Sequence, residues 1–383
     1  MIRVFRAAGI HDGYQLHRDS ELVTKDGVVL EVRARADTQD WEVVDLGGQS
    51  LWPGLVDIQV NGGGGVLVNG GATPKLLSTM LSAHSSLGTS AIVPTLITST
   101  ASDRQAAADA FRSLLEAEGA RRLPALHFEG PFISEAKRGI HPREHLARLT
   151  PADLAWLKDT ARVFPTVLTL APETLSEGTI EGLVSAGVVV SLGHSNCTFE
   201  QGRKAFEEGA SLSTHLFNGM SGITARDAGL VGASLEHARY CGLIYDRHHV
   251  SRASARIAAQ YLGSRLVLVS DCLSPPGGGP QSFEFAGRRL HVSNGVCVAD
   301  DGTLGGGAVG LLDCLRAAVE DGVMDLEAAV AASTRLPADA VGATSLGRLS
   351  PGCPADGIVV DELLNLVGAV RAGVMIDAIP RTS

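Results

Sequence analysis

The chain has 383 residues, 45% of them hydrophobic, with a formal net charge of −10 and a sequence pI of about 5.6. This length is ample for a large core, and the acidic balance argues against non-specific binding to nucleic acid or anionic membranes. No apolar stretch reaches the roughly 18–20 residues of a membrane span. Six scattered cysteines without a CxxC pair favour reduced thiols over a disulfide framework or a cysteine metal site, so we expect a cytoplasmic protein.

Residues 1–50 show short alternating runs and no long helical pattern, which predicts a small β region. Such a region buries little surface alone, so we expect it to pack with strands from the C-terminus. Leu55–Val60 then predicts a buried strand, and the glycines at 62–65 a tight loop. These glycines fit neither the GxxxxGKS/T nor the GxGxxG pattern, so a nucleotide site is the weaker interpretation.

From residue 55 the chain alternates between short β-branched apolar runs and helical patterns. The helical pattern at 198–209 begins with a capping box formed by Thr198 and Gln201. Eight strand–helix units in series predict a closed (β/α)8 barrel, with an open doubly wound sheet as the alternative. The eight runs are 55–60, 90–97, 125–129, 166–171, 187–193, 211–216, 240–246 and 266–271.

The last third of the chain returns to β character. A Pro/Gly-rich stretch at 274–281 is a candidate flap, and short strands with tight turns are expected over 281–304. Helices are predicted at 310–322 and 325–342. The expected domains are therefore a barrel over 51–342 with a β insertion around 281–304, and a small β-sandwich built from 1–50 and 343–383.

Four of the apolar runs end in, or lead directly to, a residue that can do chemistry: Glu129, His194, His215 and Asp271. The carboxyl ends of parallel barrel strands form one face, so these side chains should converge. Two imidazoles and a carboxylate suit a catalytic divalent cation with an open position, zinc first, with iron, cobalt or manganese as alternatives. Asp271 is then the natural general base.

Other residues have a function in the same picture. His141 and His249 are candidates to stabilise an oxyanion or to bind a substrate anion. Arg226 follows the sixth strand, and its planar guanidinium suits a phosphate, although a solvated surface arginine is the competing interpretation. Gln59 and Asn61 stand where many barrel hydrolases place a His-x-His pair. Amides are weak ligands for such a cation, so we predict one metal per chain.

Several motifs together now indicate a family. The sequence resembles the N-acetylglucosamine-6-phosphate deacetylases of the amidohydrolase superfamily, and the matching segments occur in family order over most of the chain. HFEGP, GHSN and THLFN are specific in combination. The other matching segments are PGLVDIQVNGGGG, KRGIHP, TLAPE, SGITARDAGLVG, CGLIYDRHHV, LVSDC and DGTLGGG.

The resemblance implies a barrel with a small β-sandwich and hydrolysis of the acetamide of N-acetylglucosamine 6-phosphate. It implies metal ligands at Glu129, His194 and His215, an acid/base at Asp271, and a carbonyl-polarising role for His141. It also implies a homodimer in which a neighbouring subunit completes the phosphate site. The implied substrate contacts, besides His141, are Asn218, Gly219, Arg226, His249, Leu304, Gly305 and Gly306.

Two departures and two alternatives remain. Arg247 and His248 precede the matched His249, and an extra cationic pair there would tighten phosphate binding or shift the sugar preference. The Gly/Pro-rich 274–281 stretch leaves the flap geometry open. An epimeric substrate such as N-acetylgalactosamine 6-phosphate fits the same motifs, and the alternative of another class is a barrel that binds a sugar phosphate without turnover.

Overall fold

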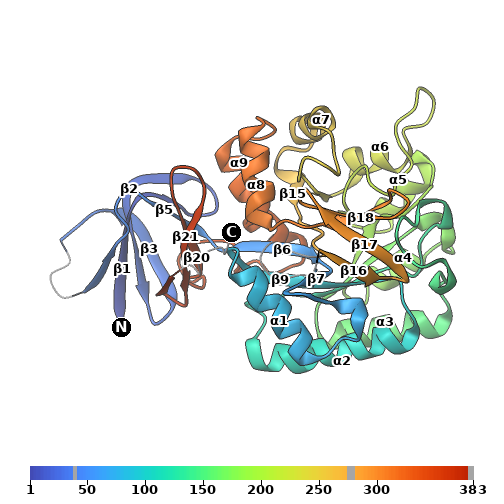
Figure 1. The fold of residues 1–383 in the computed structure, drawn as a ribbon, viewed down its shortest axis with the longest axis horizontal. Helices are drawn as coiled ribbons and strands as arrows, with labels where there is room; N and C mark the ends of the chain where they lie inside the picture. Colours follow the sequence, from blue (N-terminus) through green and yellow to red (C-terminus); the bar gives the residue numbers. More distant parts are fainter. Residues whose placement is uncertain (38–40, 274–280, 378–383) are drawn as a thin grey trace.

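The computed structural model describes residues 1–37, 41–273 and 281–377, and Figure 1 shows a small β domain beside a larger barrel. All eight predicted runs form strands of one parallel sheet. Neighbours in this sheet follow chain order from first to last, as a barrel requires and a doubly wound sheet does not. The barrel strands are β6 (Leu55–Val60), β9 (Thr89–Ile97), β10 (Leu126–Glu129), β11 (Thr166–Leu170), β12 (Val188–Leu192), β13 (Leu212–Ser213), β14 (Tyr240–Leu243) and β15 (Leu266–Leu268).

The first and last strands of this sheet meet just beyond the end of β15. Val60 forms a parallel bridge with Cys272. The amides of Asn61 and Gly62 both donate to the Cys272 carbonyl, at 2.9 and 2.8 Å. These contacts bring the end of β6 beside the segment that carries Asp271, so the barrel is nearly closed and the doubly wound alternative is wrong.

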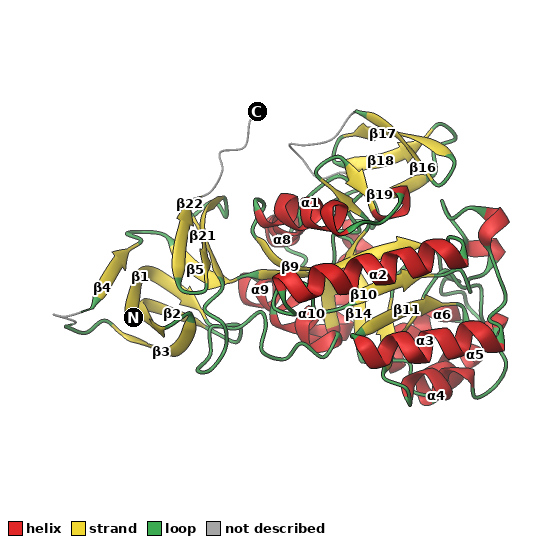
Figure 2. Cartoon of the chain, turned by 90° about the horizontal axis from the view of Figure 1, so that it is seen from below, coloured by secondary structure: helices red, strands yellow, loops and turns green. Residues whose placement is uncertain are grey.

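Helices surround the barrel (Figures 1 and 2). The predicted capping box at Thr198 is present at the start of α5, and the same reciprocal bonds begin α2 and α3. The helix predicted over 325–342 is divided at Thr334, because Pro337 has no N–H to donate to the preceding turn. The helices are α1 (Pro74–Ser85), α2 (Ala101–Glu118), α3 (Pro151–Val163), α4 (Thr179–Val184), α5 (Phe199–Glu207), α6 (Gly229–His237), α7 (Arg252–Leu262), α8 (Leu311–Glu320), α9 (Leu326–Ser333) and α10 (Arg335–Ala340).

The two ends of the described chain build one mixed sheet, as predicted. β5 pairs with β1 on one side and with β20 on the other, which joins the N-terminal strands to the C-terminal ones. Phe5, Leu22, Leu51 and Val359 share a core that is separate from the barrel core. The strands are β1 (Ile2–His11), β2 (Leu16–Lys25), β3 (Val28–Ala34), β4 (Glu42–Asp45), β5 (Ser50–Pro53), β20 (Gly357–Val360), β21 (Leu366–Arg371) and β22 (Val374–Asp377).

A third sheet follows the barrel, where short strands were predicted. It is antiparallel and consists of β16 (Ser282–Phe285), β17 (Arg288–Ser293), β18 (Val296–Ala299) and β19 (Leu304–Gly307). The turn residues Asn294 and Gly295 both have positive φ, as a tight hairpin of this kind needs. The predicted flap at 274–281 lies outside the described residues except for its last position. We keep the limits 1–50, 51–342 and 343–383 as a proposed domain division.

Candidate active site

The residues predicted at strand ends lie at the carboxyl ends of their strands. Glu129 is the last residue of β10, and His194, His215 and Asp271 follow β12, β13 and β15 by two or three positions. The latter three all have left-handed backbone, with φ of 48°, 30° and 48°. This conformation costs of order 1–3 kcal/mol at a non-glycine residue and persists where its surroundings enforce it. Three such positions around one pocket are typical of a functional site.

Glu129, His194 and His215 converge on one point. The Glu129 Oε1 atom lies 3.2 Å from His194 Nε2 and 3.0 Å from His215 Nε2, and the two Nε2 atoms are 3.1 Å apart. His194 Nδ1 faces the Lys137 carbonyl at 2.8 Å, so this nitrogen carries the proton. Nε2 is then unprotonated, and its lone pair can bind a cation. All three side chains are buried.

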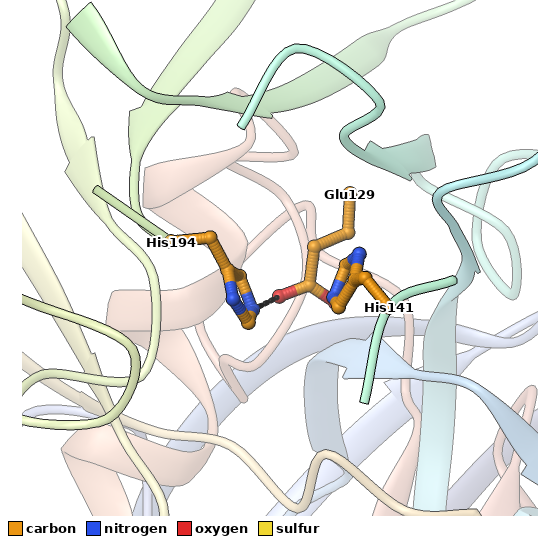
Figure 3. Close-up of side chains that lie close together, drawn as sticks. All are labelled: Glu129, His141 and His194. Carbon is orange, nitrogen blue, oxygen red and sulfur yellow. Dashed lines mark hydrogen bonds and ion pairs between the residues drawn. The ribbon is translucent and has the colours of Figure 1, made fainter. Parts of the chain in front are cut away.

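This geometry fits a divalent cation. Ligand atoms that bind zinc tetrahedrally at 2.0–2.1 Å lie ~3.3 Å from one another, close to the three separations here. A single proton cannot satisfy two ring nitrogens and a carboxylate that all face one point. Figure 3 shows His141 on another side of the Glu129 carboxylate, and ligand atoms of Glu129, His141 and His194 fall within 4.8 Å of each other. Either set of three residues could therefore hold a metal ion.

The charges in this cluster are strongly coupled. Burial would raise the pKa of Glu129, but its contacts with the His194 and His215 rings hold it well below its usual value. Burial would lower the pKa of His215, yet its hydrogen bond to Glu129 and the charge of that carboxylate raise it to about 9. The site therefore stabilises positive charge next to Glu129, as a metal ligand set must.

Asp271 faces the same cluster and is held by two amides. Asn61 Nδ2 donates to Asp271 Oδ1 at 2.6 Å, and Gln59 Nε2 donates to the same oxygen at 3.1 Å and to Glu129 Oε1 at 3.2 Å. Burial, with the nearby Glu129 charge, raises the pKa of Asp271 to about 7. From the sequence alone, both amides are predicted only to be poor metal ligands. Their function as donors to the two carboxylates was missed, because a donor to a partner 70 or more residues away leaves no local pattern.

His141 lies against the ring of His194, with centroids 4.2 Å apart. Its Nδ1 is 2.8 Å from Thr98 Oγ1 and accepts the Thr98 amide at 3.4 Å. An accepting Nδ1 leaves Nε2 as the protonated nitrogen, able to donate to a substrate oxygen. Burial, followed by the repulsion of His194, places the pKa of His141 well below its ordinary value, which agrees with a neutral ring.

These side chains line a pocket of about 140 Å³. Every predicted site residue except Arg226 contributes to its wall, and Arg226 instead lies in an exposed loop. One side of the pocket is apolar and consists of Ile97, Ile140 and Ile244. The sequence alone does not predict this apolar side. The predicted residues in the wall are Glu129, His141, His194, His215, Asn218, Gly219, His249, Asp271, Leu304, Gly305 and Gly306.

The loop after β14 orients His249 and directs Arg247 elsewhere. Asp246 Oδ2 lies 2.7 Å from His249 Nδ1. No residue in the described part of the chain bonds the opposite ring nitrogen, so that atom is available to a ligand. Arg247 pairs with Asp321 and Glu320 at the end of α8, at 2.9 and 2.7 Å. It does not line the pocket, so this structure gives no support to a second phosphate-binding cation at that position.

The comparisons with known proteins agree with this site. Residues 50–378 match the Amidohydrolase family. An N-acetylgalactosamine-6-phosphate deacetylase from Shewanella sp. (strain ANA-3) is 37% identical, with 91% of this chain and 89% of that protein covered. An N-acetylglucosamine-6-phosphate deacetylase from Haemophilus influenzae is 31% identical, with 95% and 96% covered.

A solved structure gives the same result in three dimensions. The N-acetylglucosamine-6-phosphate deacetylase from Pasteurella multocida superposes with a TM-score of 0.94 at 31% identity, over 98% of this chain and 100% of that one. In the described part of this chain no helix is long and apolar enough to cross a membrane. The barrel, its converging strand-end residues and the match over residues 50–378 lead to one conclusion: the chain belongs to the amidohydrolase family.

Proposed function

We propose that this chain hydrolyses the acetamide of N-acetylglucosamine 6-phosphate to glucosamine 6-phosphate and acetate. One observation carries the proposal: Glu129, His194 and His215 meet within 3.2 Å of one another in a pocket that also contains Asp271 and His141. Relatives named for this reaction align over more than nine-tenths of the chain. The reaction class follows from the site and the substrate from these relatives.

The chain's own residues supply the following steps. A single divalent cation, zinc in our proposal, held by Glu129, His194 and His215 would polarise the acetamide carbonyl and activate a water. His141 Nε2 donates to the carbonyl oxygen as negative charge develops there. Asp271 takes the proton of the attacking water and returns it to the sugar nitrogen as the C–N bond breaks. Asn61 and Gln59 hold Asp271 in place for both transfers.

Binding of the phosphate involves the pocket rim and, we propose, a second copy of the chain. His249, with Asn218, Gly219 and the Leu304–Gly306 segment, would contact the sugar phosphate. Arg226 is exposed on its own subunit, which suits a residue that reaches into a partner's pocket in a homodimer. Five of the six cysteines are buried and all six are thiols rather than disulfides, which supports a reducing, cytoplasmic location.

The epimeric sugar is a second candidate. The relative at 37% identity is named as an N-acetylgalactosamine-6-phosphate deacetylase. The two sugars differ only in the orientation of one hydroxyl, and the metal and phosphate contacts are the same for both. The ratio of kcat/KM for the two substrates decides between them: a higher value for the galactosamine epimer would reassign the substrate and keep the mechanism.

The first experiment measures acetate release by chelator-treated protein before and after added zinc. We expect activity to return near one metal per chain, because Gln59 and Asn61 replace the histidines that would hold a second. Restoration only near two metals would contradict the single-metal proposal. Tight binding of both sugar phosphates without hydrolysis at any metal loading would favour a binding protein.

Replacement of Asp271 by Asn separates the acid/base role from the metal. Asp271→Asn keeps the size of the side chain and removes the group that carries the proton. We expect kcat to fall by about 10²–10⁴-fold, the usual worth of general acid–base catalysis, while metal content stays near that of the wild type. Substantial residual activity in this variant would show that another group moves the proton.

A further inference from the structure

Two of the sequence motifs contain polar residues that the proposed reaction does not use. They are Glu173 of TLAPE and the pair Ser195 and Asn196, which follows His194 in GHSN. Glu173 lies in η4 (Pro172–Thr174), a single turn after β11, and the Ser-Asn pair follows β12, the next strand of the barrel. None of these three residues lines the active-site pocket, so an effect on the site must pass through their neighbours.

Both oxygens of the Glu173 carboxylate hold the segment after His194. Oε2 accepts the Ser195 hydroxyl and Oε1 accepts the Asn196 backbone amide, each at 2.6 Å. The Ser195 Oγ atom in turn accepts the Cys197 amide at 3.1 Å, and Ser195 is fully buried. Hydrogen bonds to a carboxylate are shorter and stronger than neutral ones. One side chain therefore fixes the backbone directly after a proposed metal ligand to the end of β11.

The backbone of His194 needs such support, because it is left-handed, with a φ of 48°. A non-glycine residue keeps this conformation only where its surroundings enforce it. On one side, the Ser134 amide donates to the His194 carbonyl at 2.8 Å. On the other side, the next two residues are those that Glu173 holds. The direction of the imidazole ring follows from this backbone conformation.

Ser195 also joins His194 to the segment that forms another part of the pocket wall. Its amide donates to the Gly219 carbonyl at 2.9 Å, and its carbonyl accepts the Ser221 amide at 3.0 Å. A parallel bridge pairs Ser195 with Met220. Gly219 packs closely on the metal ligand, since a Cβ atom there would lie 3.0 Å from His194 Nδ1. The position of Ser195 therefore affects both a proposed metal ligand and the wall beside it.

We propose that Glu173 is a positioning residue, which holds Ser195 and Asn196 so that His194 Nε2 is directed at the metal. This inference rests on the metal site proposed above. Residues that orient a metal ligand typically contribute a factor of roughly 10–100 to metal affinity. A merely structural contact would stabilise the metal-free and the metal-bound protein equally. A positioning contact changes the affinity for the metal, so the two roles can be separated.

The test measures the zinc Kd of the metal-free full chain by competition with a chromophoric chelator. We expect Glu173→Ala to weaken zinc binding roughly 10- to 100-fold. Glu173→Gln should lose less, because its carbonyl oxygen still accepts the Asn196 amide. Ser195→Ala removes one of the two contacts while the charge stays, and it should weaken binding several-fold. The visible absorption of bound Co²⁺ reports its coordination geometry, so Glu173→Ala should alter this spectrum at saturation and Glu173→Gln should restore it toward the wild type.

Two control variants exclude simpler explanations. Glu177→Gln removes the same charge from the exposed stretch after η4 and should leave the zinc Kd unchanged. Thr198→Ala removes the cap of α5, where Thr198 Oγ1 accepts the Gln201 amide at 3.3 Å. It should lower the Tm equally with and without zinc and leave the Kd unchanged.

The possible outcomes are distinct. A wild-type zinc Kd and a wild-type cobalt spectrum in Glu173→Ala would overturn the positioning role, as would an equal loss of affinity in Glu177→Gln or Thr198→Ala. If Glu173→Ala does not fold, an unchanged Kd in both Glu173→Gln and Ser195→Ala would overturn it. A wild-type chain that binds no zinc would contradict the metal site itself, and this proposal with it.

Discussion

Asp246 illustrates how much one side chain can organise. Its Oδ1 atom accepts the amides of His248 and His249, both at 2.9 Å, and its Oδ2 atom meets His249 Nδ1. Asp246→Asn keeps the turn but places an N–H donor against Nδ1, so the imidazole must reverse its tautomer. We expect KM for N-acetylglucosamine 6-phosphate to rise about tenfold, as for one lost charge-assisted contact, with little change in kcat. Unphosphorylated N-acetylglucosamine is the control, and an equal loss for both sugars would exclude a specific effect on phosphate binding.

Asp57, buried in β6, predicts a pH dependence of stability. Burial raises its pKa to about 7, despite hydrogen bonds from Ser270 and Gln59, against an ordinary value of 3.8. Between these values the folded chain keeps a proton that the unfolded chain releases, so stability falls as pH rises, by at most about 1.4 kcal/mol per unit. Asp57→Asn should remove its own share of this slope, while Asp271, whose pKa is also raised to about 7, contributes a share that remains. Urea unfolding from pH 4 to 7.5 measures this slope. The protein is treated with a chelator beforehand, so that release of metal at low pH does not contribute. Parallel plots of unfolding free energy against pH for the wild type and Asp57→Asn would contradict the prediction.

Some site residues can be predicted from the sequence, and others cannot. Glu129, His194, His215 and Asp271 were identifiable because each ends an apolar run, and strand ends in a barrel share one face. The functions of Gln59 and Asn61 depend on contacts between distant strands, which no local spacing encodes. The orientation of Arg247 is set by Asp321, more than 70 residues later in the chain. Side-chain partners of this kind require the tertiary structure.

At the scale of elements, β2 depends on one buried carboxylate. Glu21 is fully buried and lies opposite Arg6 of β1 and Arg33 of β3 in register, with contacts of 3.1 and 2.9 Å. Glu21→Ala leaves two partly buried guanidinium groups facing each other, and we expect unfolding free energy to fall by about 3 kcal/mol. Urea unfolding followed by the fluorescence of Trp41 and Trp52 measures this. Asp159→Ala, which removes an exposed pair with Arg162, should change nothing measurable, and an equal effect would refute the argument.

The elements themselves were largely predictable. The eight β-branched runs and the capping box at Thr198 give local signals that tertiary packing reinforces. The pattern over 325–342 failed at Pro337, whose effect on the preceding turn divides the helix. β13 is shorter than its run, because His215 turns into the left-handed conformation that directs its side chain into the pocket. The deviation from the strand pattern therefore coincides with function.

The proposed metal joins three strands of the barrel, because its ligands lie at the carboxyl ends of β10, β12 and β13. A cation that binds only the folded chain stabilises it by mass action, by about 4 kcal/mol at a thousandfold excess over Kd. We expect a chelator to lower the Tm by several degrees and one equivalent of zinc to restore it. Glu129→Gln is the matched control. Because it lacks one of the proposed ligands, its Tm should be as low as that of the chelator-treated wild type, and a chelator should not lower it further. An unchanged wild-type Tm would indicate that no tightly bound metal contributes to stability.

The terminal sheet imposes an order on the synthesis of this protein. β5 pairs with β20, which begins roughly 300 residues later, so a ribosome working at roughly 5–20 residues per second needs ~15–60 s to supply the partner. During that interval the edge of β5 has no neighbour, while the barrel is being completed between the two halves of the sheet. The first strands to leave the ribosome are thus among the last to be fully paired, and a nascent chain stalled before residue 357 carries an open β edge that invites association with other chains.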